Sequence, residues 1–158
     1  MHGNFHIPDF IIPYPQPAPK KLYLIKGMSH MYMLPSGYAV NKLGVCLNPV
    51  PVYTFQGAII FIHLAVAQFV DGKLSFDVHY EIKGESYNGY AASYTNRQAY
   101  LSVKCAVKIQ LDTAIEFLTR SPKWIESSSK MERICCETEK IKEDIRELFV
   151  IPQQISLF

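Results

Sequence analysis

The stretch AIIFIHLAVAQFVDGKLSFDVHYEIK, residues 58–83, decides the fold because it predicts two long β-strands joined by a tight turn. Asp71-Gly72 at its centre is a type I′ turn signal, since both central positions of that turn need a positive φ. A two-residue loop would set the pairing register, so we expect Phe69 opposite Leu74 and His63 opposite Tyr80. The stretch therefore predicts an antiparallel hairpin in a β-rich fold.

This register also predicts which side chains share each face of the hairpin. One face is almost wholly apolar, with Ala65 and Ala67 opposite Val78 and Phe76. The other face sets four aliphatic residues of the first strand beside four polar or charged residues of the second: Ile60, Ile62, Leu64 and Val66 beside Lys83, Glu81, His79 and Asp77. We expect a first strand buried on both sides and a half-exposed second strand.

Composition indicates a globular chain that meets a protein partner. A length of 158 residues suits one domain, and 49% hydrophobic residues with 13% aromatics exclude a disordered chain. The charged fraction of 19% is below the usual quarter, which favours some apolar surface at an interface. The net charge of +2 comes without a clustered Lys/Arg face, so the chain carries no strong nucleic-acid signal.

Cysteine usage favours an intracellular, reducing compartment such as the cytoplasm. The four cysteines show no CxxC spacing. A signal peptide is not expected, because the sequence shows no cationic start followed by an apolar run and a cleavage site. The longest apolar run, residues 58–70, is shorter than the roughly 20 residues that span a bilayer. We expect free thiols and no transmembrane segment.

Residues 1–20 are a different kind of sequence, with IIPYPQPAP at residues 11–19. Prolines lack amide donors and favour polyproline II and β conformations, so this segment is predicted to be an extended arm. Such an arm can pack on its own sheet, reach a neighbouring subunit, or enter a proline-recognition groove.

Further strands are expected on both sides of the hairpin. Before it, a strand ends near Gly27, a short one covers residues 31–34, and apolar pieces at 38–47 and 50–56 are kept at a sheet edge by prolines. After it, Asn88-Gly89 predicts a second type I′ turn that pairs Tyr87 with Tyr90. Residues 100–111 alternate apolar and polar side chains, which predicts a final half-buried strand.

Helices are expected in the last third of the chain. Thr113 and Glu116 have the spacing of a capping box that opens a short helix, and Ser121-Pro122 starts another. A long helix over about residues 130–149 carries one narrow apolar seam, formed by Met131, Ile134, Thr138, Ile141, Ile145 and Leu148. The seam is too short for a free coiled coil and favours packing on the sheet or on one helix.

Catalytic signatures are missing, so we expect no enzyme, no cofactor and no metal site. The chain contains no GxSxG, Walker, GxGxxG or HExxH motif, and the histidines are scattered. Asp77, His79 and Glu81 alternate along one strand, which would suit an acid/base site but is more often a solvated strand face.

Tyrosines are dense between Tyr80 and Tyr100, interleaved with asparagine, glutamine and Arg97. Tyrosines of this kind are favoured at interfaces, although they also cap sheet edges. Sugar or base stacking would be indicated more strongly by tryptophan or further arginines.

Together these patterns predict an α+β fold in which C-terminal helices pack on a curved or sandwich-like antiparallel sheet. Residues 21–158 form one domain, with the sheet at about 21–111 and the helices at about 113–150. The expected function is that of a non-catalytic structural or protein-interaction subunit, with a protein partner or its own copy bound. Its interaction residues are expected in the arm, the tyrosine-rich segment and the apolar tail: Tyr14, Pro15, Pro17, Tyr90, Tyr94, Arg97, Leu157 and Phe158.

Two alternative functions remain open from the sequence. A cavity between sheet and helix, above the small Ala65 and Ala67, would make the protein a carrier of a small apolar ligand. The layout of a proline-tyrosine arm before a small β-rich body also resembles that of viral matrix proteins over roughly the first 30 residues. That resemblance of layout implies a viral structural protein.

Overall fold

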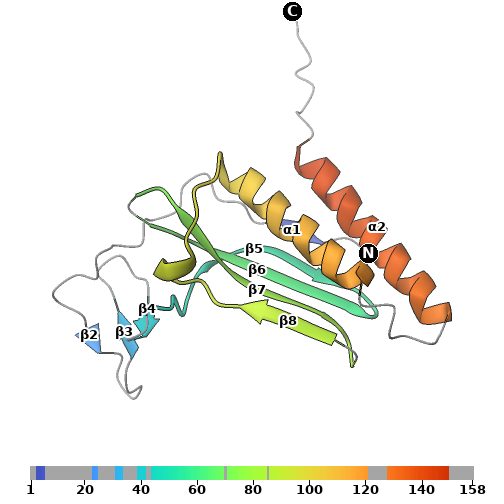
Figure 1. Ribbon diagram of the computed structural model, residues 1–158, viewed down its shortest axis with the longest axis horizontal. Helices are drawn as coiled ribbons and strands as arrows, with labels where there is room; N and C mark the ends of the chain where they lie inside the picture. Colours follow the sequence, from blue (N-terminus) through green and yellow to red (C-terminus); the bar gives the residue numbers. More distant parts are fainter. Residues whose placement is uncertain are drawn as a thin grey trace, which may run out of the picture.

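The computed structural model describes residues 3–5, 23–24, 31–33, 39–41, 44–69, 71–84, 86–120 and 128–149. Its main layer is a five-stranded antiparallel sheet in the order β1-β5-β6-β7-β8. The strands are β1 (Asn4–Phe5), β5 (Val50–Gln56), β6 (Ile60–Gln68), β7 (Leu74–Ile82) and β8 (Ser86–Tyr90). Two C-terminal helices, α1 (Val103–Arg120) and α2 (Ser128–Leu148), lie side by side on one face of this sheet (Figure 1). The predicted α+β fold class is confirmed.

A second, smaller sheet lies beside the main one at the end away from α2 (Figure 1). It is antiparallel in the order β2-β3-β4, with β2 at Tyr23–Leu24, β3 at Met31–Met33 and β4 at Ala39–Asn41. Of the apolar pieces expected before the hairpin, residues 50–56 are therefore a strand, whereas the piece at 38–47 contains only the short strand β4 among its described residues. Pro51 lies where the β5–β6 register shifts, beyond the two residues of β5 that β1 covers, so its missing amide donor costs no β1 hydrogen bond.

The central hairpin forms, but its predicted register is wrong by one residue. Ile60 pairs with Ile82 and Gln68 with Leu74. Gly72, at φ 81°, donates its amide to the Phe69 carbonyl at 2.9 Å, and Phe69 donates to the Lys73 carbonyl at the same distance. These bonds define a three-residue loop with a left-handed glycine at its end, in place of the two-residue turn.

This one-residue difference exchanges the partners on each face, because side chains alternate along a strand. The face under the helices carries buried residues of both strands: Ile60, Ile62, Leu64, Val66, Phe76, Val78, Tyr80 and Ile82. The other face sets His63 opposite His79 and Ala65 opposite Asp77. The predicted pairs of His63 with Tyr80 and Ala65 with Val78 are wrong, and all the charged residues of β7 lie on the face away from the helices.

The strand predicted over residues 100–111 is wrong, because α1 begins at Val103. Its buried side chains follow a helical period: Ala106, Val107, Leu111, Ala114, Ile115 and Leu118. Ser102 caps this helix, since the Cys105 amide donates to its Oγ at 3.1 Å. Thr113 is not a cap; it lies inside α1 and donates to the Ile109 carbonyl at 2.9 Å. The change from strands to helices therefore comes before residue 111.

The second predicted turn is also wrong, because Asn88 and Gly89 lie within β8 and pair with Tyr80 and His79. A Cβ at Gly89 would come 2.7 Å from the Val78 carbonyl oxygen, so glycine permits close approach of the two strands. The left-handed glycine after β7 is Gly84, with φ 77°. Asn88-Gly89 is therefore part of a strand, and glycine at position 89 avoids a clash with the backbone of β7.

The long C-terminal helix and its seam are confirmed. The seam residues are buried or half-buried, and α2 packs beside α1, which in turn packs on β7. The helix expected at Ser121-Pro122 lies outside the described residues. Within the described ranges, no helix is long and apolar enough to cross a membrane. The extent of the predicted single domain stays a prediction.

Candidate functional site

Helix α2 carries two buried carboxylates that the apolar seam did not reveal. Glu137 and Asp144 are 5% and 2% exposed, and their seven-residue spacing puts both on one side of the helix. Glu137 accepts the amides of Ile59 and Ile60 at 3.2 and 3.1 Å, where the chain turns from β5 into β6. A Cβ at Gly57 would overlap the Glu137 carboxylate. The Glu137 carboxylate therefore connects α2 to the turn between β5 and β6 by hydrogen bonds.

Asp144 belongs to a second contact, which we call the N-terminal seat: the side chains of Tyr53 and Asp144 and the outer edge of β5. The Gly3 amide donates to Asp144 Oδ2 at 2.7 Å, and the Tyr53 hydroxyl donates to the same oxygen at 2.9 Å. The Phe5 and Tyr53 rings lie 4.5 Å apart, and a Cβ at Gly3 would overlap the Tyr53 hydroxyl. Burial and the adjacent Asp144 carboxylate raise the pKa of Tyr53, so the phenol stays a donor.

A pocket of about 280 Å³ opens at the sheet edge, where β7 loses its neighbour strand. Strand β8 pairs with β7 only as far as Tyr90 with Val78, and the chain returns to β7 at the bridge between Gln98 and Leu74. Between these points lie η1 (Tyr94–Asn96) and the pocket. We call it the tyrosine pocket, and its lining is Leu74, Ser75, Phe76, Tyr90, Asn96, Gln98, Tyr100 and Gln110.

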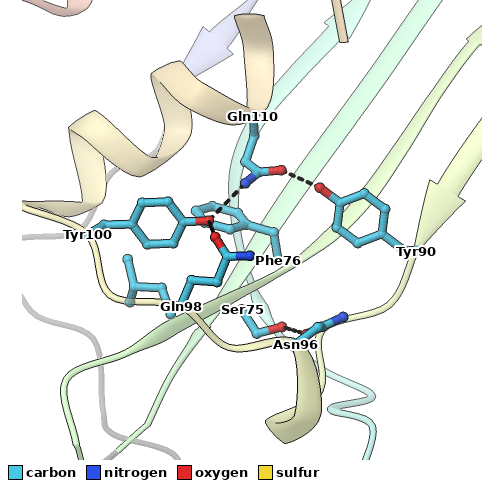
Figure 2. Close-up of a pocket in the computed structure, with 8 residues that line it drawn as sticks. Ser75, Phe76, Tyr90, Asn96, Gln98, Tyr100 and Gln110 are labelled. Atoms are coloured by element: carbon cyan, nitrogen blue, oxygen red, sulfur yellow. Dashed lines mark hydrogen bonds between the residues drawn. The ribbon is translucent and has the colours of Figure 1, made fainter. Parts of the chain in front are cut away.

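A chain of hydrogen bonds runs around the tyrosine pocket (Figure 2). The Tyr90 hydroxyl donates to Gln110 Oε1, and Gln110 Nε2 donates to the Tyr100 hydroxyl at 3.2 Å. Tyr100 in turn donates to Gln98 Oε1 at 3.2 Å. Burial is the main cause that raises the pKa of Tyr90 to about 12, so its hydroxyl keeps its proton at neutral pH. The chain therefore runs in one direction, from Tyr90 to Gln98.

The inner part of the pocket is held by the loop that carries η1. Ser75 Oγ donates to Asn96 Oδ1 and accepts the Ser93 amide at 2.9 Å. The Phe76 ring meets the Tyr100 ring edge-on, with centroids 6.1 Å apart. Every residue of the lining is uncharged. The pocket thus combines aromatic edges with neutral hydroxyl and amide groups.

The sheet face away from the helices carries a group that we call the histidine row, which consists of His79 and its neighbours Phe61, Glu81 and Tyr87. The His79 ring lies between those of Phe61 and Tyr87, at 5.2 and 4.7 Å between centroids. Its Nε2 is 3.8 Å from Glu81 Oε2, beyond hydrogen-bond distance, and has no hydrogen-bond partner among the described residues. The expected side-by-side arrangement of His79 and Glu81 exists, and a use in acid/base chemistry stays a hypothesis.

The predicted interaction residues are not brought together into one described site. Tyr90 is 42% exposed and forms a wall of the tyrosine pocket. Arg97 Nε binds Asp71 Oδ2 at 2.9 Å beside the hairpin loop, and this bond lowers the pKa of Asp71. Tyr94 begins η1. The remaining residues lie outside the described part of the chain: Tyr14, Pro15, Pro17, Leu157 and Phe158. Their role stays a prediction.

Several site residues escaped sequence reasoning for identifiable reasons. The strand predicted over residues 100–111 would place Gln110 on its polar face, whereas in α1 the Gln110 side chain accepts a hydrogen bond from Tyr90. Glu137 and Asp144 occur three residues after Ile134 and Ile141, a repeat on the seam side that could have revealed them. Among the thiols, Cys46 is buried, and burial raises its pKa to about 11, which disfavours a nucleophilic role.

Among the described residues, no three histidine, cysteine, aspartate or glutamate side chains group together in a way that could hold a metal ion. Comparison with known protein families, curated proteins and solved structures gave no match to the chain.

Proposed function

We propose that the protein is a non-catalytic assembly subunit that binds a second copy of itself by exchange of its N-terminal segment. The observation that carries this proposal is the N-terminal seat. Gly3 reaches Asp144 across 141 positions of sequence, and the seat is built from side chains that are almost fully buried, Tyr53 at 0% and Asp144 at 2% exposed.

The seat is selective for the segment that occupies it. Gly3 is required because any larger residue would overlap the Tyr53 hydroxyl, and the aromatic ring of Phe5 packs on the Tyr53 ring. The amide of Gly3 supplies a hydrogen bond to a buried carboxylate, which is stronger than a bond between neutral groups. Residues 3–5 of an identical chain would make the same contacts.

Exchange is inexpensive because the seated strand is short. β1 pairs with β5 through only Asn4 with Thr54 and Phe5 with Tyr53. Releasing two residue pairs and remaking them on a second copy conserves every contact, which is the energetic basis of strand exchange between identical subunits. The proline-rich segment that contains Tyr14, Pro15 and Pro17 would then cross between subunits. The C-terminal residues Leu157 and Phe158 would add apolar surface at the interface.

Light scattering after size exclusion tests this proposal. We expect the intact chain to form a dimer or larger oligomer, and a version beginning at Lys20 to be monomeric. Gly3→Ala should also give a monomer, because the added Cβ displaces the segment from the seat. Glu143→Gln, which changes an exposed carboxylate on α2, serves as the matched control and should keep the oligomer.

Two results would contradict the proposal. One is an intact chain that stays monomeric at every concentration. The other is an oligomer that survives both removal of residues 1–19 and the Gly3→Ala substitution.

A further inference from the structure

We propose that the tyrosine pocket binds a small uncharged ring that carries several hydroxyl groups, that is, a monosaccharide unit. The pocket lies at the sheet edge beside β7, β8 and α1, away from the N-terminal seat, so ligand binding there does not depend on strand exchange. Its volume of about 280 Å³ lies just below the range of about 300–1,000 Å³ that drug-sized ligands occupy.

The charge of the lining excludes ionic ligands. All eight lining residues are neutral side chains, and the high pKa of Tyr90 keeps that phenol neutral as well. A phosphate or carboxylate in the pocket would lose hydration without meeting an opposite charge, which is strongly unfavourable. A purely apolar ligand is disfavoured for the complementary reason, because it would cover the Tyr90 oxygen and the Gln98 amide protons at the two ends of the hydrogen-bond chain without bonding to them.

The direction of the hydrogen-bond chain indicates which ligand groups fit. Since the Tyr90 hydroxyl gives its proton to Gln110, its oxygen remains an acceptor at one end of the chain. At the other end, Gln98 uses its Oε1 to accept from Tyr100, so both protons on its Nε2 remain to be donated. A ligand therefore meets an acceptor at one end of the chain and donors at the other, and a hydroxyl group can bond to either.

The arrangement of the rings favours a cyclic ligand. Tyr90 and Tyr100 stand on opposite sides of the opening, with Phe76 between them and Gln110 above (Figure 2). Aromatic rings of this kind supply apolar contact for the C–H groups of a sugar, while the amides serve its hydroxyls. The neutral lining, the mixed donors and acceptors, and the flanking rings point to the same ligand class.

Titrations of the intact chain followed by NMR test this inference. The probes are four neutral sugars: glucose, galactose, mannose and N-acetylglucosamine. We expect at least one to bind with a dissociation constant of about 10 mM or lower, shifting the resonances of residues around the pocket. Glucose 6-phosphate and uridine are the contrasting probes, and we expect both to bind more weakly.

Variants assign the binding to this pocket. Gln110→Ala removes the amide that links the two tyrosines, and we expect it to weaken binding about tenfold. Tyr90→Phe removes only a hydroxyl from a partly exposed residue, so we expect it to keep the fold. It removes the hydrogen bond from Tyr90 to Gln110. Tyr87→Phe is the matched control, because Tyr87 belongs to the same strand but packs on His79 and is 63% exposed.

The inference is overturned if none of the four sugars shows saturable binding. It is equally overturned if uridine or the sugar phosphate binds more tightly, or if Gln110→Ala and Tyr90→Phe bind as well as Tyr87→Phe.

Discussion

Tyr53 shows how one buried side chain can link two distant parts of the sequence. Its hydroxyl shares Asp144 Oδ2 with the Gly3 amide, and its ring packs on Phe5. Because burial and the Asp144 charge both oppose ionisation, the pKa of Tyr53 in the folded protein lies above its value of about 10 in the unfolded chain.

This raised pKa predicts a loss of stability at alkaline pH. Above about pH 10 the unfolded chain releases the phenolic proton while the native state keeps it, so the free energy of unfolding falls as pH rises. Below that pH the stabilisation is fully present. Tyr53→Phe should therefore cost about 1–2 kcal/mol near pH 8, and this difference from the original protein should shrink near pH 11.

Urea unfolding of both proteins at the two pH values measures the effect. Tyr87→Phe, at an exposed tyrosine, should stay parallel to the original protein. An equal loss of stability for Tyr53→Phe at both pH values would contradict the assignment.

Element α1 is the place where a strand pattern and a helix pattern overlap in one sequence. Residues 101, 103, 105, 107, 109 and 111 alternate apolar side chains, yet Leu101 and Ile109 are exposed. Val107, Leu111, Ala114 and Leu118 recur at spacings of four, three and four, which is the helical period. The longer pattern prevails because it buries a continuous stripe against β7 and α2.

The position of the cap distinguishes the two interpretations of this element. Ser102→Ala should lower the free energy of unfolding by about 1 kcal/mol, because the Cys105 amide loses its acceptor. Thr113→Ala should be neutral or raise it by a few tenths of a kcal/mol, since alanine has the higher helix propensity and Thr113 is exposed within α1. Thermal or urea unfolding of both variants provides the comparison. If Thr113→Ala lowers the free energy of unfolding more than Ser102→Ala does, the result would support the capping box that the sequence predicts at Thr113.

At the scale of the whole molecule, α2 connects the helix layer to the sheet layer by buried carboxylates as well as by apolar packing. Glu137→Ala would leave the amides of Ile59 and Ile60 without their acceptor in a partly buried turn. We expect it to lower the free energy of unfolding by about 3 kcal/mol.

Glu139→Ala is the matched control, since it makes the same replacement in the same helix at an exposed residue paired with Lys142. Its effect should stay within about 0.5 kcal/mol. If urea unfolding gives equal costs for the two variants, Glu137 does not pin the layers together.

The sequence by itself determined the elements whose patterns are local: the hairpin strands around Asp71-Gly72, the seam of α2 and the α+β class. Periodicity and turn residues depend on neighbours a few positions away, so they can be read without the fold. Within the tyrosine-rich segment it also indicated Tyr90, a residue that forms part of the pocket wall.

Only the tertiary structure decided the hairpin register, the helical state of residues 103–111, the N-terminal seat and the closure of the tyrosine pocket by Gln110. Each of these depends on partners far apart in the chain. A three-residue loop and a two-residue loop are both compatible with Asp-Gly, and burial under the helices selects between them because a one-residue slip exchanges the two faces of the sheet. A carboxylate on a helix is normally expected to face solvent. Asp144 is buried because the fold brings the Gly3 amide, from the other end of the chain, against it.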